Sequence, residues 1–230
     1  MKSQIYSMQS IEDAKICLEA GADRIGVLAS ERCGEFPCEV KEKDAYEIFR
    51  LLDGKCTSIL ISVGRNEEEI FHQLEYLRPN VLHLCANYTG SPSFREHMRE
   101  KFPDIELMEA VGITTREESI KEALRVAEYA DYLLLDSVSA TVKGIGAAGV
   151  THDWSIDKEI IDLVSIPVIV AGGLGPENVK EAMEKLHPWG VDSLTKTSIL
   201  KDGKIVAKDK EKVNEFCRIV KEEALWKFCA

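Results

Sequence analysis

Residues 163–179, LVSIPVIVAGGLGPENV, and residues 190–198, GVDSLTKTS, decide the fold of this chain. The first stretch reads as a buried strand that ends in a glycine turn and leads into a helix. The second reads as another strand, and its end is polar. Backbone N–H groups at such a turn and at a helix N-terminus point toward an anion such as a phosphate. The rest of the chain repeats the same unit of strand and helix.

Short apolar runs bounded by turn residues recur along the chain and predict parallel strands that are buried on both faces. Eight runs are present, at residues 4–8, 24–29, 57–63, 81–85, 105–111, 132–136, 167–171 and 190–195. Helix start signals lie between them: Ser10, Asn66, Thr115 three residues before Glu118, and Pro176 as a first helical residue. Strict alternation of strand and helix predicts an α/β fold, a (β/α)8 TIM barrel that forms a single domain over residues 1–230.

Composition agrees with such a barrel and excludes several other classes. The formal net charge is −11, so the chain lacks the broad basic surface of a nucleic-acid-binding protein. No apolar run reaches the length of a membrane span, and the N-terminus has no signal pattern. The seven cysteines have no zinc spacing; Cys33 and Cys38 lie five residues apart without a partner pair. We therefore expect reduced thiols and a cytoplasmic location.

The carboxyl ends of the strands carry function in this fold. The phosphate is usually held after the seventh and eighth strands, which predicts a phosphate site at Gly172 and Gly173 on one side. Thr195, Lys196 and Thr197 form its other side. The remaining strand ends supply polar or reactive side chains for the rest of a substrate, at Tyr6, Arg32, His83, Cys85, Glu109, Asp136 and Asp192. Of these we expect Arg32, His83, Cys85 and Glu109 to bind the substrate.

Three ordered motifs add a family resemblance to this pattern. They are residues 11–14 (IEDA) with 21–26 (GADRIG); 134–136 (LLD) with a glycine-rich loop that closes on 152–154 (HDW); and 171–179 with 190–192 (GVD). Together they resemble the first, sixth and last two βα units of the phosphoribosylanthranilate isomerase family. The resemblance implies a TIM-barrel enzyme of tryptophan biosynthesis, whose reaction is an Amadori rearrangement that turns a phosphorylated aminoaldose into an aminoketose.

The chain departs from the family pattern at three places that bear on chemistry. The family's first strand carries Lys-Ile-Cys-Gly, whose cysteine is the general base, whereas residues 4–7 here are QIYS. The family's last turn reads Ser-Ser-Gly-Val-Glu, whereas residues 194–198 are LTKTS and contain no glycine. The family's fourth strand reads Gln-Leu-His-Gly, whereas residues 83–86 are HLCA. The resemblance thus implies the family's fold and acid together with an altered base.

The Amadori rearrangement needs an acid for the ring oxygen and a base for the proton at C2. Asp136 ends an otherwise apolar strand, where burial favours a carboxyl that serves as general acid; the alternative is a structural hydrogen bond to a loop. Tyr6 stands where the family has its base, and a cation from Lys196 would have to depress its pKa, because an unperturbed tyrosine is a weaker acid than cysteine. Cys85 or His83 could supply the base instead, or either could fill the core.

Two loop positions match the family as well. Arg32 follows the second strand, where the resemblance implies an arginine that binds the substrate carboxylate; the alternative is a solvated loop arginine. Asp153 and Trp154 match the Phe-Asp-Trp motif, and Asp153 reads as a helix N-cap. The last stretch, residues 208–228, is a charged amphipathic helix that we expect to be the final outer helix of the barrel.

Lys196 leaves a different class of function open. A desolvated lysine at the inner end of a strand is the arrangement of a Schiff-base aldolase. The simpler reading is a lysine that pairs with the phosphate as a point charge. A non-catalytic barrel that binds a sugar phosphate is also possible, although such a barrel has no need for an acid at Asp136. We expect an isomerase that acts on a small phosphorylated substrate, without cofactor, metal, nucleic acid or membrane, as a monomer or homodimer.

Overall fold

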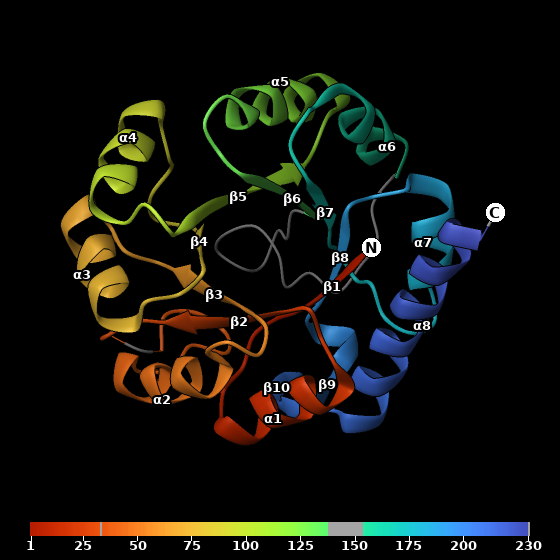
Figure 1. Ribbon diagram of the computed structural model, residues 1–230, viewed down its shortest axis with the longest axis horizontal. Coiled ribbons are helices and arrows are strands. Elements are labelled where there is room, and N and C mark those ends of the chain that lie inside the picture. Colours follow the sequence, from red (N-terminus) through yellow and green to blue (C-terminus); the bar gives the residue numbers. More distant parts are fainter. Residues whose placement is uncertain (33, 138–153, 230) are drawn as a thin grey trace.

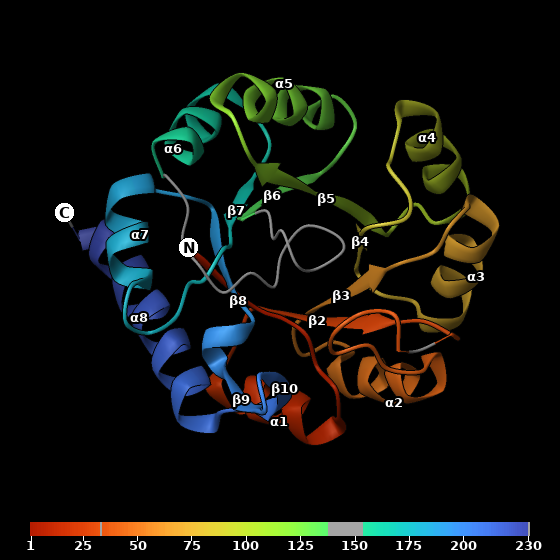
Figure 2. The same ribbon diagram turned by 180° about the vertical axis from the view of Figure 1, so that it is seen from behind.

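The computed structural model describes residues 1–32, 34–137 and 154–229, the last six of these by their backbone alone. Eight parallel strands close into a barrel, with helices around its outside (Figure 1, and Figure 2 from behind). This confirms the predicted TIM barrel. The strands are β1 (Lys2–Ile5), β2 (Arg24–Ala29), β3 (Thr57–Ser62), β4 (Val81–Leu84), β5 (Glu106–Ile113), β6 (Tyr132–Ser137), β7 (Val168–Val170) and β8 (Gly190–Ser193).

The helices begin close to the predicted start signals. They are α1 (Ile11–Ala20), α2 (Glu42–Leu52), α3 (Glu67–Leu77), α4 (Pro92–Lys101), α5 (Arg116–Ala127), α6 (Trp154–Leu163), α7 (Val179–Leu186) and α8 (Lys210–Cys229). Ser10, Asn66 and Thr115 each accept a hydrogen bond from the backbone N–H three residues on, as an N-cap does. The predicted cap at Asp153, the loop before it and Cys33 lie outside the described residues.

Pro176 is not the first residue of a helix, and that expectation was wrong. The side chain of Asn178 folds back over the turn, where it accepts a hydrogen bond from the Gly175 N–H (2.8 Å) and donates one to the Gly173 carbonyl (3.1 Å). These bonds hold residues 175–178 as a turn, so that α7 begins only at Val179. The extra turn brings the chain back against the end of β8.

A β-hairpin between β8 and α8 was not predicted. After a short 3₁₀ helix, η1 (Thr195–Thr197), β9 (Ser198–Lys201) and β10 (Lys204–Lys208) pair in an antiparallel manner. Most of the hairpin is exposed, so its sequence lacks the continuous apolar run that marks the barrel strands. The hairpin lies beside α1, next to the seam where β1 pairs with β8 (Figure 1).

The apolar core has two parts, one inside the barrel and one between the barrel and the helices. One apolar cluster fills the barrel and includes Ile59, Ile61, Met108, Leu134 and Ile169. The larger cluster packs the outer face of the strands against the helices. Because side chains alternate along a strand, membership of these clusters identifies which polar residues face inward.

Candidate active site

Seven polar or reactive side chains face the barrel interior, at the positions that alternate with the outer cluster. They are Gln4, Tyr6, Arg24, His83, Cys85, Asp136 and Asp192. All except Cys85 are less than 10 % exposed. Gln4 and Arg24 were not among the predicted site residues, because an inward-facing polar residue in the middle of a strand has no local sequence signal. Asp192 was named among the strand-end side chains, but no role was predicted for it.

Asp192 is held by a chain of polar side chains across the barrel. The Gln4 Nε2 donates to Asp192 Oδ1 (3.1 Å), and the Gln4 Oε1 accepts from the Arg24 Nε (2.9 Å). The Arg24 guanidinium in turn lies 4.3 Å from the centre of the Tyr132 ring. This chain fixes the Asp192 carboxyl in one orientation, while the positive charge of Arg24 is satisfied within the barrel.

Asp192 and Asp136 form an electrostatically coupled pair at the carboxyl end of the barrel. Burial and, next in effect, the negative charge of Asp136 raise the pKa of Asp192 to about 8. Asp136 ends the inner face of β6, and its Oδ1 accepts a hydrogen bond from the Ser137 N–H (2.7 Å). The charge of Asp136 thus acts on the ionisation of Asp192.

Tyr6 is buried and bonded to His83, which corrects the expectation that it acts as a base activated by Lys196. Its hydroxyl lies 3.1 Å from His83 Nδ1, and its ring lies over Gly26, where a Cβ would overlap the ring. Burial, with Asp192 next in effect, raises the pKa of Tyr6 well above its usual value. The phenol therefore keeps its proton at neutral pH, and Lys196 does not contribute to its environment.

The two other base candidates, His83 and Cys85, also lie inside the barrel. Burial lowers the pKa of His83 to about 4, so its imidazole is neutral at pH 7. Its Nε2 is buried and has no hydrogen-bond partner among the described residues. Burial raises the pKa of Cys85 to about 11, and the charge of Asp136 acts in the same sense. Cys85 is thus a thiol rather than a thiolate at neutral pH.

The two predicted halves of the phosphate site lie together. Gly172 and Gly173 have φ values of 86° and 67°, which only glycine adopts readily. The N–H groups of Gly172, Gly173 and Leu174 donate to no other residue in the described part of the chain. The Ser193 Oγ donates to the Leu174 carbonyl (2.6 Å), which ties this turn to the end of β8. The result is a row of free backbone donors beside the last strand.

Lys196 and Thr197 are placed differently from the predictions. The Lys196 Nζ pairs with Glu177 at 2.8 Å, and its side chain is 41 % exposed, so the lysine is neither desolvated nor aimed into the barrel. The Thr197 hydroxyl is buried and faces the carbonyls of Ser193 (3.4 Å) and Leu194 (3.2 Å). It therefore caps the strand end and is not available to an anion.

Glu109 faces away from the barrel interior, and its predicted contact with substrate is corrected. Its neighbours Met108 and Ala110 belong to the inner cluster, so Glu109 points to the outer face. There it accepts hydrogen bonds from the Gly90 N–H (2.6 Å) and the Tyr129 hydroxyl (3.0 Å). Glu109 on β5 thus connects the loop between β4 and α4 with the segment that follows α5.

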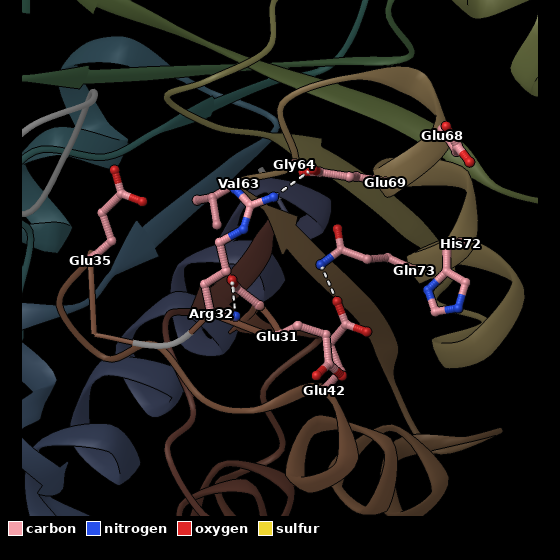
Figure 3. Close-up of a pocket in the computed structure, with 11 residues that line it drawn as sticks. Glu31, Arg32, Glu35, Glu42, Val63, Gly64, Glu68, Glu69, His72 and Gln73 are labelled. Carbon is pink, nitrogen blue, oxygen red and sulfur yellow. Dashed lines mark hydrogen bonds and ion pairs between the residues drawn. The ribbon is translucent and has the colours of Figure 1, made fainter.

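Arg32 lies at the mouth of the barrel in the loop after β2. Its guanidinium pairs with Glu69 on α3 at 2.6 Å and is half exposed (Figure 3). Arg32 is the residue for which we predicted binding of the substrate carboxylate. A substrate carboxylate would have to take the place of Glu69.

Lys208, at the end of β10, is a buried lysine that sequence reasoning missed. Its Nζ donates to the Tyr6 carbonyl and to the Ser198 Oγ (2.9 Å), and lies 3.5 Å from the Leu194 carbonyl. Its own N–H donates to Asp13 Oδ1 (2.7 Å). Burial lowers the pKa of Lys208. The ammonium thus joins the ends of β1 and β8.

Three further features of the described residues concern metal binding, membrane spans and disulfides. No group of three or more His, Cys, Asp or Glu side chains is arranged to hold a metal ion. No helix there is long and apolar enough to cross a membrane. Five of the described cysteines are free thiols: Cys17, Cys38, Cys56, Cys85 and Cys217.

Comparison with known proteins relates this arrangement to one family. The sequence profile described as N-(5'phosphoribosyl)anthranilate (PRA) isomerase matches residues 3–218. The N-(5'-phosphoribosyl)anthranilate isomerase of Methanocella arvoryzae is 34 % identical over 79 % of this chain and 81 % of its own length. That of Methanopyrus kandleri is 32 % identical over 96 % and 99 %.

A solved structure of an enzyme with the same name as these relatives also resembles this chain. The phosphoribosyl anthranilate isomerase of Thermotoga maritima is 25 % identical and superposes with a TM-score of 0.76 over 96 % of this chain and 99 % of that one. The profile match spans most of the chain, and the two relatives align with it over 81 % and 99 % of their own lengths. The chain belongs to the N-(5'-phosphoribosyl)anthranilate isomerase family.

Proposed function

We propose that this protein isomerises N-(5'-phosphoribosyl)anthranilate in the carboxyl end of its barrel. The observation that carries the proposal is the Asp136–Asp192 pair, which lies on the inner face of β6 and β8 beside the turn with free backbone donors. The reaction moves a hydrogen from C2 of the sugar while the ring C–O bond opens. It therefore needs one acid and one base on the same substrate.

The carboxyl pair can supply both groups. In the acid step a protonated carboxyl gives its proton to the ring oxygen, and the bond from this oxygen to C1 breaks. In the base step a carboxylate removes the proton from C2, and the resulting enolamine becomes the aminoketose. We assign the acid to Asp136, as the family resemblance implies, and the base to Asp192.

Coupling between the two carboxyls makes this assignment chemically consistent. When Asp136 holds the proton, the negative charge that helps to raise the pKa of Asp192 is removed. The pKa of Asp192 then falls toward its ordinary value, so that its ionised form, which can accept the proton from C2, becomes more populated. Tyr6 and Cys85 are not available as bases, because burial raises the pKa of both and they keep their protons at neutral pH. In this proposal Asp192 takes over the role of the family's first-strand cysteine, whose place is occupied by Tyr6.

The two ends of the substrate have candidate partners on either side of this pair. The N–H groups of Gly172, Gly173 and Leu174 support a phosphate site, with Thr195 and the Lys196 ammonium at its edge. Arg32 supports a site for the anthranilate carboxylate, reached when its bond to Glu69 is exchanged. We further propose a cytoplasmic protein that acts as a monomer or homodimer without nucleic acid or membrane.

Turnover of N-(5'-phosphoribosyl)anthranilate by Asp136→Asn tests the proposal. Loss of a general acid typically lowers kcat about 10²–10⁴-fold, and the isosteric amide should leave the unfolding free energy nearly unchanged. Asp104→Asn changes an exposed aspartate by the same chemistry and should keep full activity. Wild-type kcat in Asp136→Asn would remove this residue from the mechanism. Substrate binding by the wild type without turnover would favour the non-catalytic alternative.

A further inference from the structure

A second pocket lies outside the barrel interior, between the first turns of α2 and α3. It measures about 320 Å³, which is within the range of small-molecule sites. The loop after β2, the loop after β3 and the two helices line it (Figure 3). It shares Arg32 and Glu69 with the proposed site for the substrate carboxylate, whereas its other lining residues have no role in the proposed isomerisation. Five glutamates line the pocket: Glu31, Glu35, Glu42, Glu68 and Glu69.

The two nearby arginines neutralise only two of these glutamates. Arg32 pairs with Glu69 at 2.6 Å, and Arg65 pairs with Glu35 at 3.4 Å. The other three, Glu31, Glu42 and Glu68, form no ion pair with a residue in the described parts of the chain. The negative charge of the pocket is therefore concentrated on the side of α2 and the first turn of α3.

Glu42 is a buried carboxylate in a fixed orientation. It is 4 % exposed, and its Oε1 accepts a hydrogen bond from the Gln73 Nε2 (2.8 Å). Gln73 is itself fixed, because its Nε2 also donates to the Ala29 carbonyl (3.0 Å) and its Oε1 accepts from the Ser62 Oγ (2.5 Å). Both N–H groups of Gln73 are thereby used.

The second oxygen of Glu42 is left without a donor. Oε2 is buried and has no hydrogen-bond partner among the described residues. A buried carboxylate oxygen without a partner is unfavourable, typically by about 1–3 kcal/mol or more, and native proteins seldom keep one without a reason. Burial and the neighbouring carboxylate of Glu31 raise the pKa of Glu42, whereas the hydrogen bond from Gln73 and the nearby His72 lower it.

We propose that this pocket binds the primary ammonium group of a small amine, held by Glu42 and Glu31. A compact ammonium has three N–H donors, so it can give one to Glu42 Oε2 and another to the carboxylate of Glu31. A planar guanidinium favours both oxygens of one carboxylate, and Oε1 of Glu42 is already taken by Gln73. A metal ion would need more ligands than the described residues bring together in this pocket.

The carboxylates of the amine site are separate from the catalytic carboxyl pair, although Arg32 borders both sites. Glu42 and Gln73 lie between the outer face of β2 and β3 and the helices, whereas Asp136 and Asp192 face the barrel interior. The proposal therefore does not depend on the reaction assigned to the carboxyl pair.

Calorimetric titration with 1,4-diaminobutane tests the proposal, with butane-1,4-diol as the uncharged probe of the same length. We expect the wild type to bind the diamine and not the diol. Glu42→Gln should raise the Kd of the diamine at least tenfold, because an amide replaces the buried charge. Glu31→Gln, a change in an exposed loop residue that should not disturb folding, should raise it at least threefold.

Glu100→Gln is the matched control, since it removes one exposed glutamate charge on α4, away from the pocket. It should leave the Kd unchanged, and thermal unfolding should show that all variants are folded. Equal weakening by Glu100→Gln and Glu42→Gln would mean that the diamine responds only to overall charge. Wild-type affinity in Glu42→Gln, or binding of the diol as tight as that of the diamine, would also overturn the proposal.

Discussion

Replacing Asp192 by asparagine should stabilise the protein in weakly alkaline solution. The unfolded chain loses the Asp192 proton near pH 3.8, whereas the folded protein keeps it until about pH 8. Between these values the folded state binds more protons than the unfolded state, so the stability that comes from this group is full in acid and is lost as the pH rises. Asparagine cannot ionise and can still accept the hydrogen bond from Gln4.

The size of the effect follows from the width of the pH window. One pKa unit corresponds to about 1.4 kcal/mol, so the wild type should lose about 2 kcal/mol from this group between pH 6.5 and 8. His83 acts in the opposite sense, because its lowered pKa of about 4 makes stability rise with pH, but that contribution is complete near pH 6.5. The interval above pH 6.5 therefore isolates Asp192.

Urea unfolding of both proteins at pH 6.5 and pH 8 measures this difference. We expect the free energy of unfolding of Asp192→Asn to exceed that of the wild type by about 2 kcal/mol more at pH 8 than at pH 6.5, with equal m-values. Asp104→Asn, an exposed aspartate, should follow the wild type at both pH values. Parallel pH dependence in Asp192→Asn and the wild type would refute the burial and coupling inferred for this carboxyl.

Three further predictions concern other residues of the site. Gly26→Ala places a methyl group inside the Tyr6 ring, so thermal unfolding should show a loss of about 1–3 kcal/mol; an unchanged midpoint would mean that the ring does not lie over Gly26. Borohydride treatment with substrate should trap no adduct on Lys196, and Lys196→Met should weaken substrate binding by about 1.5–3 kcal/mol while kcat is kept; a covalent adduct by mass spectrometry would restore the aldolase alternative. Tyr6→Cys should raise isomerase turnover if the rest of the family site is intact, and no gain in kcat would indicate a pocket rebuilt around the carboxyl pair.

The fold could be predicted because its signal is repeated and local. Eight apolar runs with turn residues between them leave little choice of architecture, and caps such as Ser10 act within one turn of the chain. The hairpin of β9 and β10 was missed because its side chains are mostly exposed and carry no alternating apolar pattern. Its strands are stabilised by their position beside α1 and the end of β8, which sequence spacing does not reveal.

The candidate site was predictable only in part, because the face of a strand depends on register. Glu109 lies within β5 and Asp136 near the end of β6, yet the first faces the helices and the second faces the barrel. A shift of one residue along the strand moves a side chain to the opposite face of the sheet. An apolar run locates the end of a strand only to within about one residue, so it cannot decide the face. Partners distant in sequence, such as Glu69 for Arg32 and Gln4 for Asp192, likewise emerge only when the barrel closes.

Lys208 has a consequence for how the protein is made. Its ammonium bonds to the carbonyl of a residue 202 positions earlier, across the seam where the first strand meets the last. While the chain leaves the ribosome, β1 has one edge without a partner until β8 has emerged, and the seam is not fastened until Lys208 follows. An unpaired strand edge invites pairing with other chains. Emergence of residues 190–208 is therefore the step at which an aggregation-prone open sheet becomes a closed and protected one.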